Sequence, residues 1–540
     1  KTQHPFIDRT SLVIVGDHVT LESGTGCVHT APGHGIEDFV VCKNYPEIPI
    51  IVPVDAKGRL TEEAGMFAGL TTEEANKPIA LHLEKIGALF ALKKIEHQYP
   101  HCWRCHKPVI FRATSQWFCS VDDFKDDAVK AAEDVKWFPE WGKDRLQSMV
   151  KERADWCISR QRKWGVPIPV VYCQDCGKEI IDNDIMMKVS KIFGEEGSDA
   201  WFAHDTEYFL PEGFKCPHCG SAKGFDKEKD IMDVWFDSGS SHAAVCARRK
   251  YLKVPADVYL EGADQYRGWF QSSLLTSVAG GHGAPYKQII THGWTVDGEG
   301  KKMSKSLGNG IAPQEIISKY GADILRLWVA SADYHADIRI SPEILKQISD
   351  NYRKLRNTAR YCLSNLYDFD PDKDMVSNDE LEELDKYALM KLDEVIKIAR
   401  DAFEVYDYHT AAHSLHNFCV VEMSNFYFDV LKDRLYTSAP QSKTRRAAQT
   451  VLYKVLDALT LVLTPILAFT ADEIWQSMPH DKSRNGESPL FNEIPQPDFI
   501  EADSDFIAKW DRIHAVRFDV QKALELARNE KIIGKPLEAK

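Results

Sequence analysis

The sequence lacks several features that would place it in other classes of protein. Its most apolar stretch, 455–470, contains Asp457 and Pro465 and is too short to cross a bilayer, so we expect a buried helix there. No signal-peptide pattern opens the chain, and we find no internal repeat or low-complexity tract. An excess of positive charge is also missing, because the formal net charge is −14. This balance excludes a generally basic nucleic-acid coat, although local basic surfaces can still bind phosphates.

The composition is that of a folded protein with several domains. Hydrophobic residues make up 44% and charged residues 27% of the 540 residues, so we expect three or four domains. The 13 cysteines include three C-x-x-C pairs, a spacing that suits a metal better than disulfides. We therefore expect a protein of the reducing cytoplasm, with no membrane association. The pairs are Cys102/Cys105, Cys173/Cys176 and Cys216/Cys219.

The second and third pairs predict a structural zinc site. Four thiolates in two knuckles are typical of a tetrahedral zinc centre, and a glycine (Gly177, Gly220) follows each pair, which fits a tight turn. The 39 residues between the pairs mean that the fold must bring them together. The alternative is four buried cysteines without a metal. Because four thiolates leave no open position on the metal, we expect a structural role; Cys102 and Cys105 provide half of another site.

The pattern along the first two thirds of the chain predicts two domains. Residues 1–98 mix short β-type runs (11–15 and 50–54) with a helical stretch (73–86), which indicates a small α+β unit. From 99 to 345, β-type runs alternate with helical patterns, and this alternation predicts a parallel sheet with covering helices. A cysteine-bearing insert at 170–225 interrupts it. The β-type runs are 234–236, 258–260 and 288–291, with a helix expected over 270–279.

The last third of the sequence predicts a helical bundle. Ser341-Pro342-Glu343 has the form of a helix start, and apolar residues then recur at helical spacing up to about 478. Residues 479–540 read as a linker and the start of a further junction. The first helix carries a basic cluster, which is either a solvated face or a phosphate-binding surface: Lys346, Arg353, Lys354, Arg356 and Arg360. Further helices are expected over 384–403, 409–431 and 444–463.

A glycine- and serine-rich loop at 298–309 holds two lysines, Lys302 and Lys305. Preplaced ammonium groups stabilise the charge that builds on the pyrophosphate when a nucleophile attacks the α-phosphorus of ATP. From charge alone, a solvated lysine turn between two elements is the more frequent explanation. Residues 302–306 read KMSKS, which is the signature of class I aminoacyl-tRNA synthetases. The resemblance implies that Lys305 contacts ATP, with Lys302 and Ser304 beside it.

Two further segments resemble the isoleucyl-tRNA synthetases within that class. Residues 233–242 read DVWFDSGSSH and residues 260–270 read LEGADQYRGWF. The resemblance implies that a polar strand end binds the ATP-derived part of the adenylate and that indoles line a slot for the branched side chain. Ala263 and Tyr266 depart from the Ser and His usual there. The implied adenylate contacts are Glu261, Gly262, Asp264 and His292, with Gln265 on the α-ammonium group and Trp235 and Trp269 around the side chain.

Residues 24–38, which read GTGCVHTAPGHGIED, resemble the editing domain of the same enzymes. An editing site is needed because one methylene changes binding too little to reject valine, isoleucine over valine being the reference case for this limit. The resemblance implies that Asp38 holds the ammonium group of the misattached amino acid and that His29 lines the pocket. A glycine-rich loop with a turn-capping histidine is the alternative. The threonine-rich part of this domain would precede residue 1, so we expect a partial editing domain.

The resemblance implies an α/β and α fold: the second half of a Rossmann-type catalytic domain with a partial α+β editing domain, a zinc-binding insert and a helical-bundle anticodon-binding domain. It implies a monomeric isoleucine–tRNA ligase that uses ATP, Mg²⁺ and structural Zn²⁺, binds isoleucine and tRNA(Ile), and edits valyl-tRNA. The HIGH signature of the class is not found, so we expect no pyrophosphate exchange from these 540 residues alone. Robust isoleucine-dependent exchange by them would contradict this.

Three other interpretations stay open at this point. One is a valyl-tRNA synthetase-like enzyme, whose lysine loop is shared but whose tryptophan segments differ. Another is an editing hydrolase without synthetic activity, in which the lysine loop would have no role. The third is a zinc-ribbon module that binds tRNA without regard to isoleucine.

Overall fold

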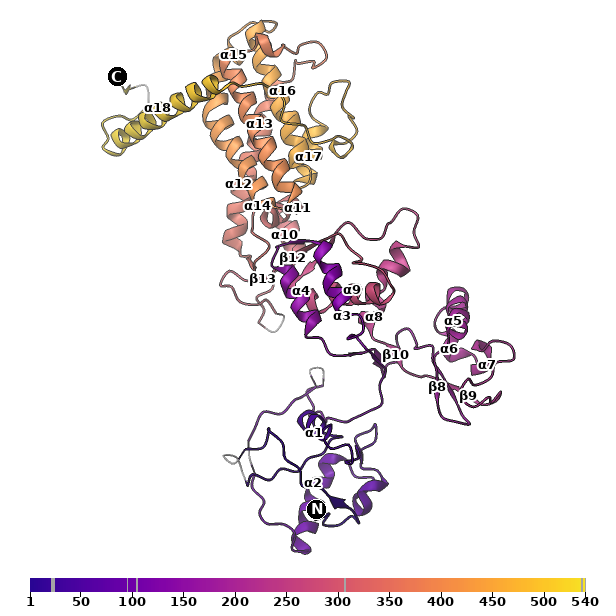
Figure 1. Ribbon diagram of the computed structural model, residues 1–540. Coiled ribbons are helices and arrows are strands. Elements are labelled where there is room, and N and C mark those ends of the chain that lie inside the picture. The colour runs from indigo at the N-terminus through magenta and orange to yellow at the C-terminus, as the bar shows by residue number, and fades with distance from the viewer. Residues whose placement is uncertain (21–24, 95, 103–104, 305–306, 536–537, 540) are drawn as a thin grey trace. The chain divides into compact units, whose positions relative to one another are not determined.

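The computed structural model describes residues 1–540 except 21–24, 95, 103–104, 305–306, 536–537 and 540 (Figure 1). The chain forms two compact units. One comprises Lys1–Cys119 with Cys157–Ser159, and the other comprises Ser120–Trp156 with Arg160–Lys540. Each unit has its own architecture. No helix in the described part of the chain is both long and apolar enough to cross a membrane.

The first unit is a small α+β structure. The helix expected over 73–86 is confirmed as α2, whose first turn is closed by a capping box between Thr71 and Glu74. The runs at 11–15 and 50–54 are not continuous strands, and this expectation was wrong. Val13 and Val15 are exposed, and Pro53 has no N–H to donate to a strand partner. Its elements are β1 (Thr2–Gln3), β2 (Thr10–Ser11), α1 (Ile36–Cys42), η1 (Glu62–Phe67), α2 (Thr72–Lys85) and β3 (Phe118–Cys119).

The second unit contains the predicted parallel sheet. Its strands lie in the order β11-β12-β4 and all pairings are parallel, with Ile289 of β12 opposite both Tyr259 and Trp137. Helices α3, α4 and α9 pack around these strands, as Figure 1 shows. The bounds are β4 (Lys136–Phe138), β11 (Tyr259–Gly262), β12 (Gln288–His292), α3 (Lys125–Ala131), α4 (Gly142–Lys151) and α9 (Trp269–Ala279).

One predicted strand of this region is a helix. Residues 234–236 belong to α8 (Val234–Gly239), which packs against α9. The valine and two aromatic residues favour a strand, but Asp233 caps the helix by accepting the backbone N–H of Trp235 at 3.4 Å. A strong N-cap directly before a short run therefore outweighs the β propensity of the run.

Short elements complete the region around the sheet. Strand β13 comes just before the lysine loop, and β14 follows the two helices that come after this loop. The two strands pair in parallel. The remaining elements are η2 (Ala132–Asp134), β5 (Trp156–Cys157), β6 (Ser159–Arg160), β10 (Ile231–Met232), η3 (His242–Cys246), η4 (Ala263–Arg267), β13 (Thr295–Val296), α10 (Pro313–Tyr320), α11 (Ala322–Ala330) and β14 (Ile338–Arg339).

The cysteine-bearing insert has its own small core. A three-stranded antiparallel sheet in the order β8-β7-β9 packs with three helices around the fully buried Trp201 and Phe209. The elements are β7 (Val171–Cys173), β8 (Glu179–Ile180), α5 (Asn183–Glu196), α6 (Ala200–Ala203), α7 (Thr206–Phe209) and β9 (Phe225–Lys227).

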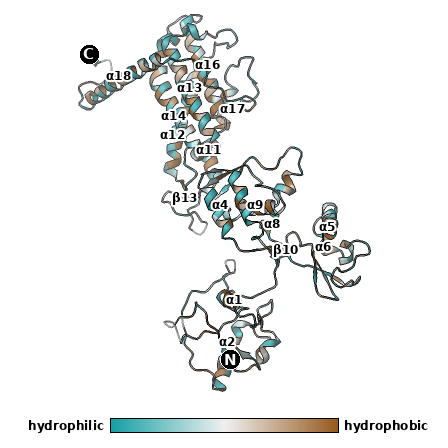
Figure 2. Ribbon diagram, in the orientation of Figure 1, coloured by the Kyte–Doolittle hydropathy of each residue, from teal (hydrophilic) through white to brown (hydrophobic). Residues whose placement is uncertain are grey.

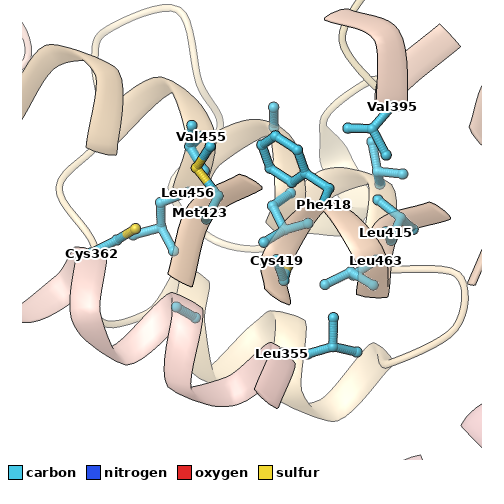
Figure 3. Close-up of a cluster of buried hydrophobic side chains, with 14 of the residues drawn as sticks. Leu355, Cys362, Val395, Leu415, Phe418, Cys419, Met423, Val455, Leu456 and Leu463 are labelled. Carbon is cyan, nitrogen blue, oxygen red and sulfur yellow. The ribbon is translucent and has the colours of Figure 1, made fainter. Parts of the chain in front are cut away.

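The helical bundle is confirmed. Its first helix begins after Ser341, whose hydroxyl accepts the N–H of Ile344 at 3.3 Å. Figure 3 shows side chains from different helical segments meeting in its core, including Leu355, Leu415, Met423 and Leu456. The elements are α12 (Pro342–Asn365), η5 (Asn378–Glu380), α13 (Glu383–Glu404), α14 (Tyr408–Asn417), the π-helical segment η6 (Phe418–Tyr427), α15 (Phe428–Tyr436), α16 (Lys443–Leu463) and α17 (Ala468–Trp475).

Past the bundle, the proline-rich stretch contains the short helix η7 (Pro489–Phe491), and the chain then forms the long helix α18 (Ser504–Asn529). Along α18, hydrophobic and hydrophilic residues alternate without a single apolar stripe (Figure 2). Trp510 is its buried anchor and stacks on Tyr387 of α13 at a centroid distance of 4.5 Å.

Two polar contacts fasten α11 to the bundle. A carboxylate oxygen of the buried Asp323 accepts both the backbone N–H and the hydroxyl of Thr470, at 2.7 and 2.6 Å. Arg326 donates from Nε to the carbonyl oxygen of Ile466 at 2.8 Å. Charge-assisted hydrogen bonds thereby hold α11 against α17 and the residues just before it.

Candidate active site and metal centre

The carboxyl ends of β11 and β12 bring four of the predicted residues together. Gly262 lies opposite His292 in the parallel register, and Glu261 precedes it. A Cβ atom on Gly262 would lie 2.9 Å from a carboxylate oxygen of Asp264 and 3.5 Å from Cε1 of His292. The glycine therefore lets these two side chains approach each other at the end of the sheet, where open α/β sheets bind ligands.

Gln265 and the two tryptophans form the next part of the site. The carboxamide oxygen of Gln265 accepts the backbone N–H of Trp269 at 2.7 Å, and its nitrogen donates to Asp264 at 3.3 Å. Trp269 donates from Nε1 to the carbonyl oxygen of Ser238 at 2.9 Å, which ties α9 to α8. Trp235 projects from α8 and is 41% exposed, so its indole is available to a ligand.

Asp233 anchors α8, a role that the sequence did not reveal. Its carboxylate accepts the indole N–H of Trp156 at 3.0 Å and lies 3.1 Å from Arg160. Both partners belong to residues 155–165, which read DWCISRQRKWG. These residues resemble the segment through which the chain of isoleucyl-tRNA synthetases re-enters the catalytic domain. Burial and then the charge of Asp233 raise the pKa of Asp237, one turn along α8, to about 6.

The lysine loop is held by two residues that the sequence analysis did not single out. One carboxylate oxygen of Asp297 accepts backbone N–H groups of the loop, and the other accepts the amide of Asn309 at 2.8 Å. Asn309 in turn accepts the N–H of Ser304 at 3.0 Å. These bonds, that of Asn309 first, lower the pKa of Asp297. Lys302 is exposed beside this frame, whereas Lys305 lies outside the described residues.

Tyr266, which departs from the resemblance, lies in the core and not in the site. Its side chain is fully buried, and its hydroxyl is 2.8 Å from that of Thr291. A Cβ atom on Gly142 would overlap this hydroxyl, so the glycine of α4 makes the room that the larger ring needs. The tyrosine at position 266 therefore changes the packing of the core between α4 and the sheet.

The predicted editing residues lie in the first unit. Asp38, in α1, accepts the backbone N–H of Ala31 at 3.0 Å, which closes the glycine-rich loop onto the helix. His29 is exposed on the same loop. A Cβ atom on Gly33 would clash with the carbonyl oxygen of Ile51, so a side chain here would separate the loop from its neighbour.

The four insert cysteines converge. Their sulfur atoms all lie within 4.8 Å of one another, and no other group of three or more such ligands is found among the described residues. The Sγ atoms of Cys173 and Cys219 are 3.6 Å apart, and those of Cys176 and Cys216 are 3.8 Å apart. A regular tetrahedron with zinc–sulfur bonds of about 2.3 Å has edges of about 3.8 Å. The sulfur positions therefore fit a four-thiolate zinc centre.

The three C-x-x-C pairs share one hydrogen bond that is typical of a zinc knuckle. In each, the residue after the second cysteine has a positive φ and donates its N–H to the carbonyl of the first cysteine at 2.8 Å; these residues are His106, Gly177 and Gly220. Burial opposes ionisation of Cys216, but nearby backbone N–H groups and thiols lower its pKa to about 6. Cys102 and Cys105 thus share this hydrogen bond at the turn but belong to no larger ligand group within the described residues.

Two members of the basic cluster on α12 are already paired. Arg356 forms a bidentate ion pair with Glu473 of α17, and Arg353 pairs with Asp350. The hydrogen bonds to Glu473 raise the pKa of Arg356. Lys346, Lys354 and Arg360 are exposed on the same helix. Fewer cations of this cluster are therefore available to bind phosphates than the sequence suggests.

Comparison with known proteins decides the family. Residues 34–341, more than half of the chain, match the family described as tRNA synthetases class I (I, L, M and V). The chain belongs to the class I tRNA synthetases. Residues 385–540 of this synthetase match the anticodon-binding domain of tRNA ligase. The expected catalytic family and anticodon-binding bundle are thus confirmed.

Curated relatives of this class I synthetase are isoleucine–tRNA ligases. It is 58% identical to that of Caldicellulosiruptor bescii, over 100% of this chain and 58% of the relative. It is 56% identical to that of Thermoanaerobacter pseudethanolicus, with the same coverage. The chain spans about 58% of the length of these relatives. Methionyl-tRNA synthetase of Mycobacterium tuberculosis bound by methionyl-adenylate shares the fold, with a TM-score of 0.51, 18% identity and coverage of 74% of this chain and 70% of that one.

Proposed function

We propose that this chain carries the isoleucyl-adenylate and tRNA-binding parts of an isoleucine–tRNA ligase of the cytoplasm. The observation that carries the proposal is the cluster of motif residues at the carboxyl ends of β11 and β12, in a chain whose curated relatives are isoleucine–tRNA ligases. We propose the division 1–98 for a partial editing domain, 99–345 for the catalytic domain with its insert at 170–225, 346–478 for the anticodon-binding bundle and 479–540 for the junction that follows.

In the first step, isoleucine and ATP, with Mg²⁺, give isoleucyl-adenylate and pyrophosphate. Lys302 and Lys305 would neutralise charge that develops on the phosphates, and Ser304 of the same loop would contact the phosphates beside them. Glu261, Gly262, Asp264 and His292 would hold the adenosine side. The carboxamide oxygen of Gln265 would accept a hydrogen bond from the α-ammonium group, and its second lone pair lets it keep the bond from the N–H of Trp269.

Zinc would have a structural role. Cys173, Cys176, Cys216 and Cys219 would hold it, and the sulfur separations of 3.6 and 3.8 Å support this assignment. A metal bound by four thiolates fixes the ends of the insert and has no open coordination position for chemistry. Cys102 and Cys105 would contribute half of a second centre.

In the second step, the isoleucyl group passes from the adenylate to the ribose of the last adenosine of tRNA(Ile), which the bundle would bind. The first unit would separately hydrolyse valyl-tRNA. Lys346, Lys354 and Arg360 are exposed cations on α12 that can contact phosphates without reading bases. In the first unit, Asp38 and His29 would bind the misattached valine. The closure of this loop by Asp38 and Ala31 supports a preformed pocket.

Replacing Gln265 with alanine tests the function. In the whole protein that contains this chain, isoleucine-dependent pyrophosphate exchange is expected to lose about 10- to 150-fold in kcat/KM, since a hydrogen bond to a charged group contributes about 1.5–3 kcal/mol. The KM for isoleucine should rise more than the KM for ATP. Glu261→Ala should instead raise the KM for ATP.

Asp257→Ala is the matched control. Asp257 precedes the amino end of β11, at the other end of the strand from Glu261, and its carboxylate pairs with Lys253 and Lys287. Its loss should leave both KM values unchanged. Exchange that depends on valine instead of isoleucine would support the valyl-specific alternative. An unmodified protein that binds tRNA but shows no amino-acid-dependent exchange would contradict the synthetase function.

A further inference from the structure

The ring of Tyr259 stacks on one face of the Trp269 indole. Tyr259 opens β11 and is 4% exposed, and its ring is nearly parallel to the indole of Trp269, at 4.0 Å between centroids and 9° between planes. The ring of Tyr259 also contacts that of the buried Tyr286, at 4.8 Å between centroids. The indole nitrogen of Trp269 is held by the carbonyl of Ser238. The indole is therefore fixed both in its plane and from one face.

Gly268 occupies the point where Gln265 and Trp235 meet. A Cβ atom on Gly268 would lie 2.3 Å from the carboxamide oxygen of Gln265 and 3.1 Å from the tip of the Trp235 indole. The first of these distances is far inside van der Waals contact. The carboxamide is also bonded to the N–H of Trp269, so it cannot yield without breaking that bond. A side chain at position 268 would thus displace the residue proposed to bind the ammonium group or one proposed wall of the slot.

We propose that Tyr259 and Gly268 are positioning residues that set the width of the amino-acid slot between Trp235 and Trp269. This inference rests on the proposed function, in which these indoles enclose the aliphatic side chain. Isoleucine differs from valine by one methylene, whose binding depends on close contact with both walls. A narrower slot excludes this methylene, and a wider slot loses its contacts. Either displacement therefore harms isoleucine more than valine.

The inference is tested by the ratio of kcat/KM for isoleucine to that for valine, measured by pyrophosphate exchange in the whole protein. Gly268→Ala and Tyr259→Leu are each expected to lower this ratio about tenfold, within the range that one methylene commands in a hydrophobic pocket, for which isoleucine over valine is the reference case. Tyr259→Phe keeps the stacked ring and should retain the ratio. Gly283→Ala is the matched glycine control, because a Cβ atom there meets nothing within 4 Å.

An equal loss for both amino acids would overturn the inference, since it would mean that Tyr259 and Gly268 serve only stability. If Gly268→Ala does not fold, the comparison of Tyr259→Leu with Tyr259→Phe decides the question. Unmodified protein that does not activate isoleucine would instead overturn the proposed function. If the unmodified protein activates isoleucine and the folded variants keep its isoleucine-to-valine ratio of kcat/KM, this inference alone is overturned.

Discussion

Removing the zinc that we propose for the four-cysteine cluster is expected to unfold the insert between β7 and β9 while the helical bundle stays folded. The core of the insert is small, and a core of this size contributes only about 3–5 kcal/mol to stability. A structural zinc contributes about 10–16 kcal/mol of binding free energy, which is available to the folded state alone. Without the metal, the four sulfur atoms are left within 4.8 Å of one another with no shared cation.

Cys216→Ser is the corresponding substitution. We expect it to lower the zinc content by about one equivalent per chain and to expose the insert to limited proteolysis, with cuts mapped by mass spectrometry. Cys246→Ser provides a matched control, because Cys246 is a half-buried cysteine outside the cluster. Its zinc content and cleavage pattern should match those of the unmodified protein. A Cys216→Ser variant with full zinc content and a protease-resistant insert would contradict the assignment.

Replacing Asp385 with alanine is expected to destabilise the bundle by about 3–5 kcal/mol, because the cation of Arg434 loses its bidentate partner and keeps only the half-exposed Glu382, at 3.3 Å, as a counter-charge. Asp385 is fully buried in α13 and accepts two hydrogen bonds from Arg434 of α15, at 2.9 and 2.8 Å. It also accepts the hydroxyl of the buried Tyr427 at 2.6 Å. Burial and then the charge of Asp385 raise the pKa of Tyr427, which keeps this hydroxyl protonated as a donor.

The measurement is urea-induced unfolding followed by the helical circular dichroism signal. Asp401→Ala is the control on the same helix; Asp401 is exposed, so its loss should change the stability by less than about 0.5 kcal/mol. Adding Arg434→Leu to Asp385→Ala should recover part of the loss, because the cation that lost its buried carboxylate partner is then removed. Equal unfolding midpoints for Asp385→Ala and Asp401→Ala would refute this account of the bundle.

Local sequence patterns predicted much of the fold. The knuckles at Gly177 and Gly220 follow from the C-x-x-C-Gly pattern, because the bonds that form them span four residues. Ser341 capped the helix that it was expected to start. The strand expected at 234–236 failed because three residues with high β propensity carry less information than the capping aspartate before them.

The motifs by themselves determined the family and the residues of the candidate site, since KMSKS and the two tryptophan segments are local strings. Only the tertiary structure decided what holds those residues. Asp233 meets Trp156, which lies 77 positions away, and Tyr259 meets Trp269 across the start of α9. The space at Gly268 also depends on where Trp235 of another helix comes to lie. Such contacts depend on the path of the whole chain, whereas a local pattern specifies only the backbone and the spacing of its own few residues.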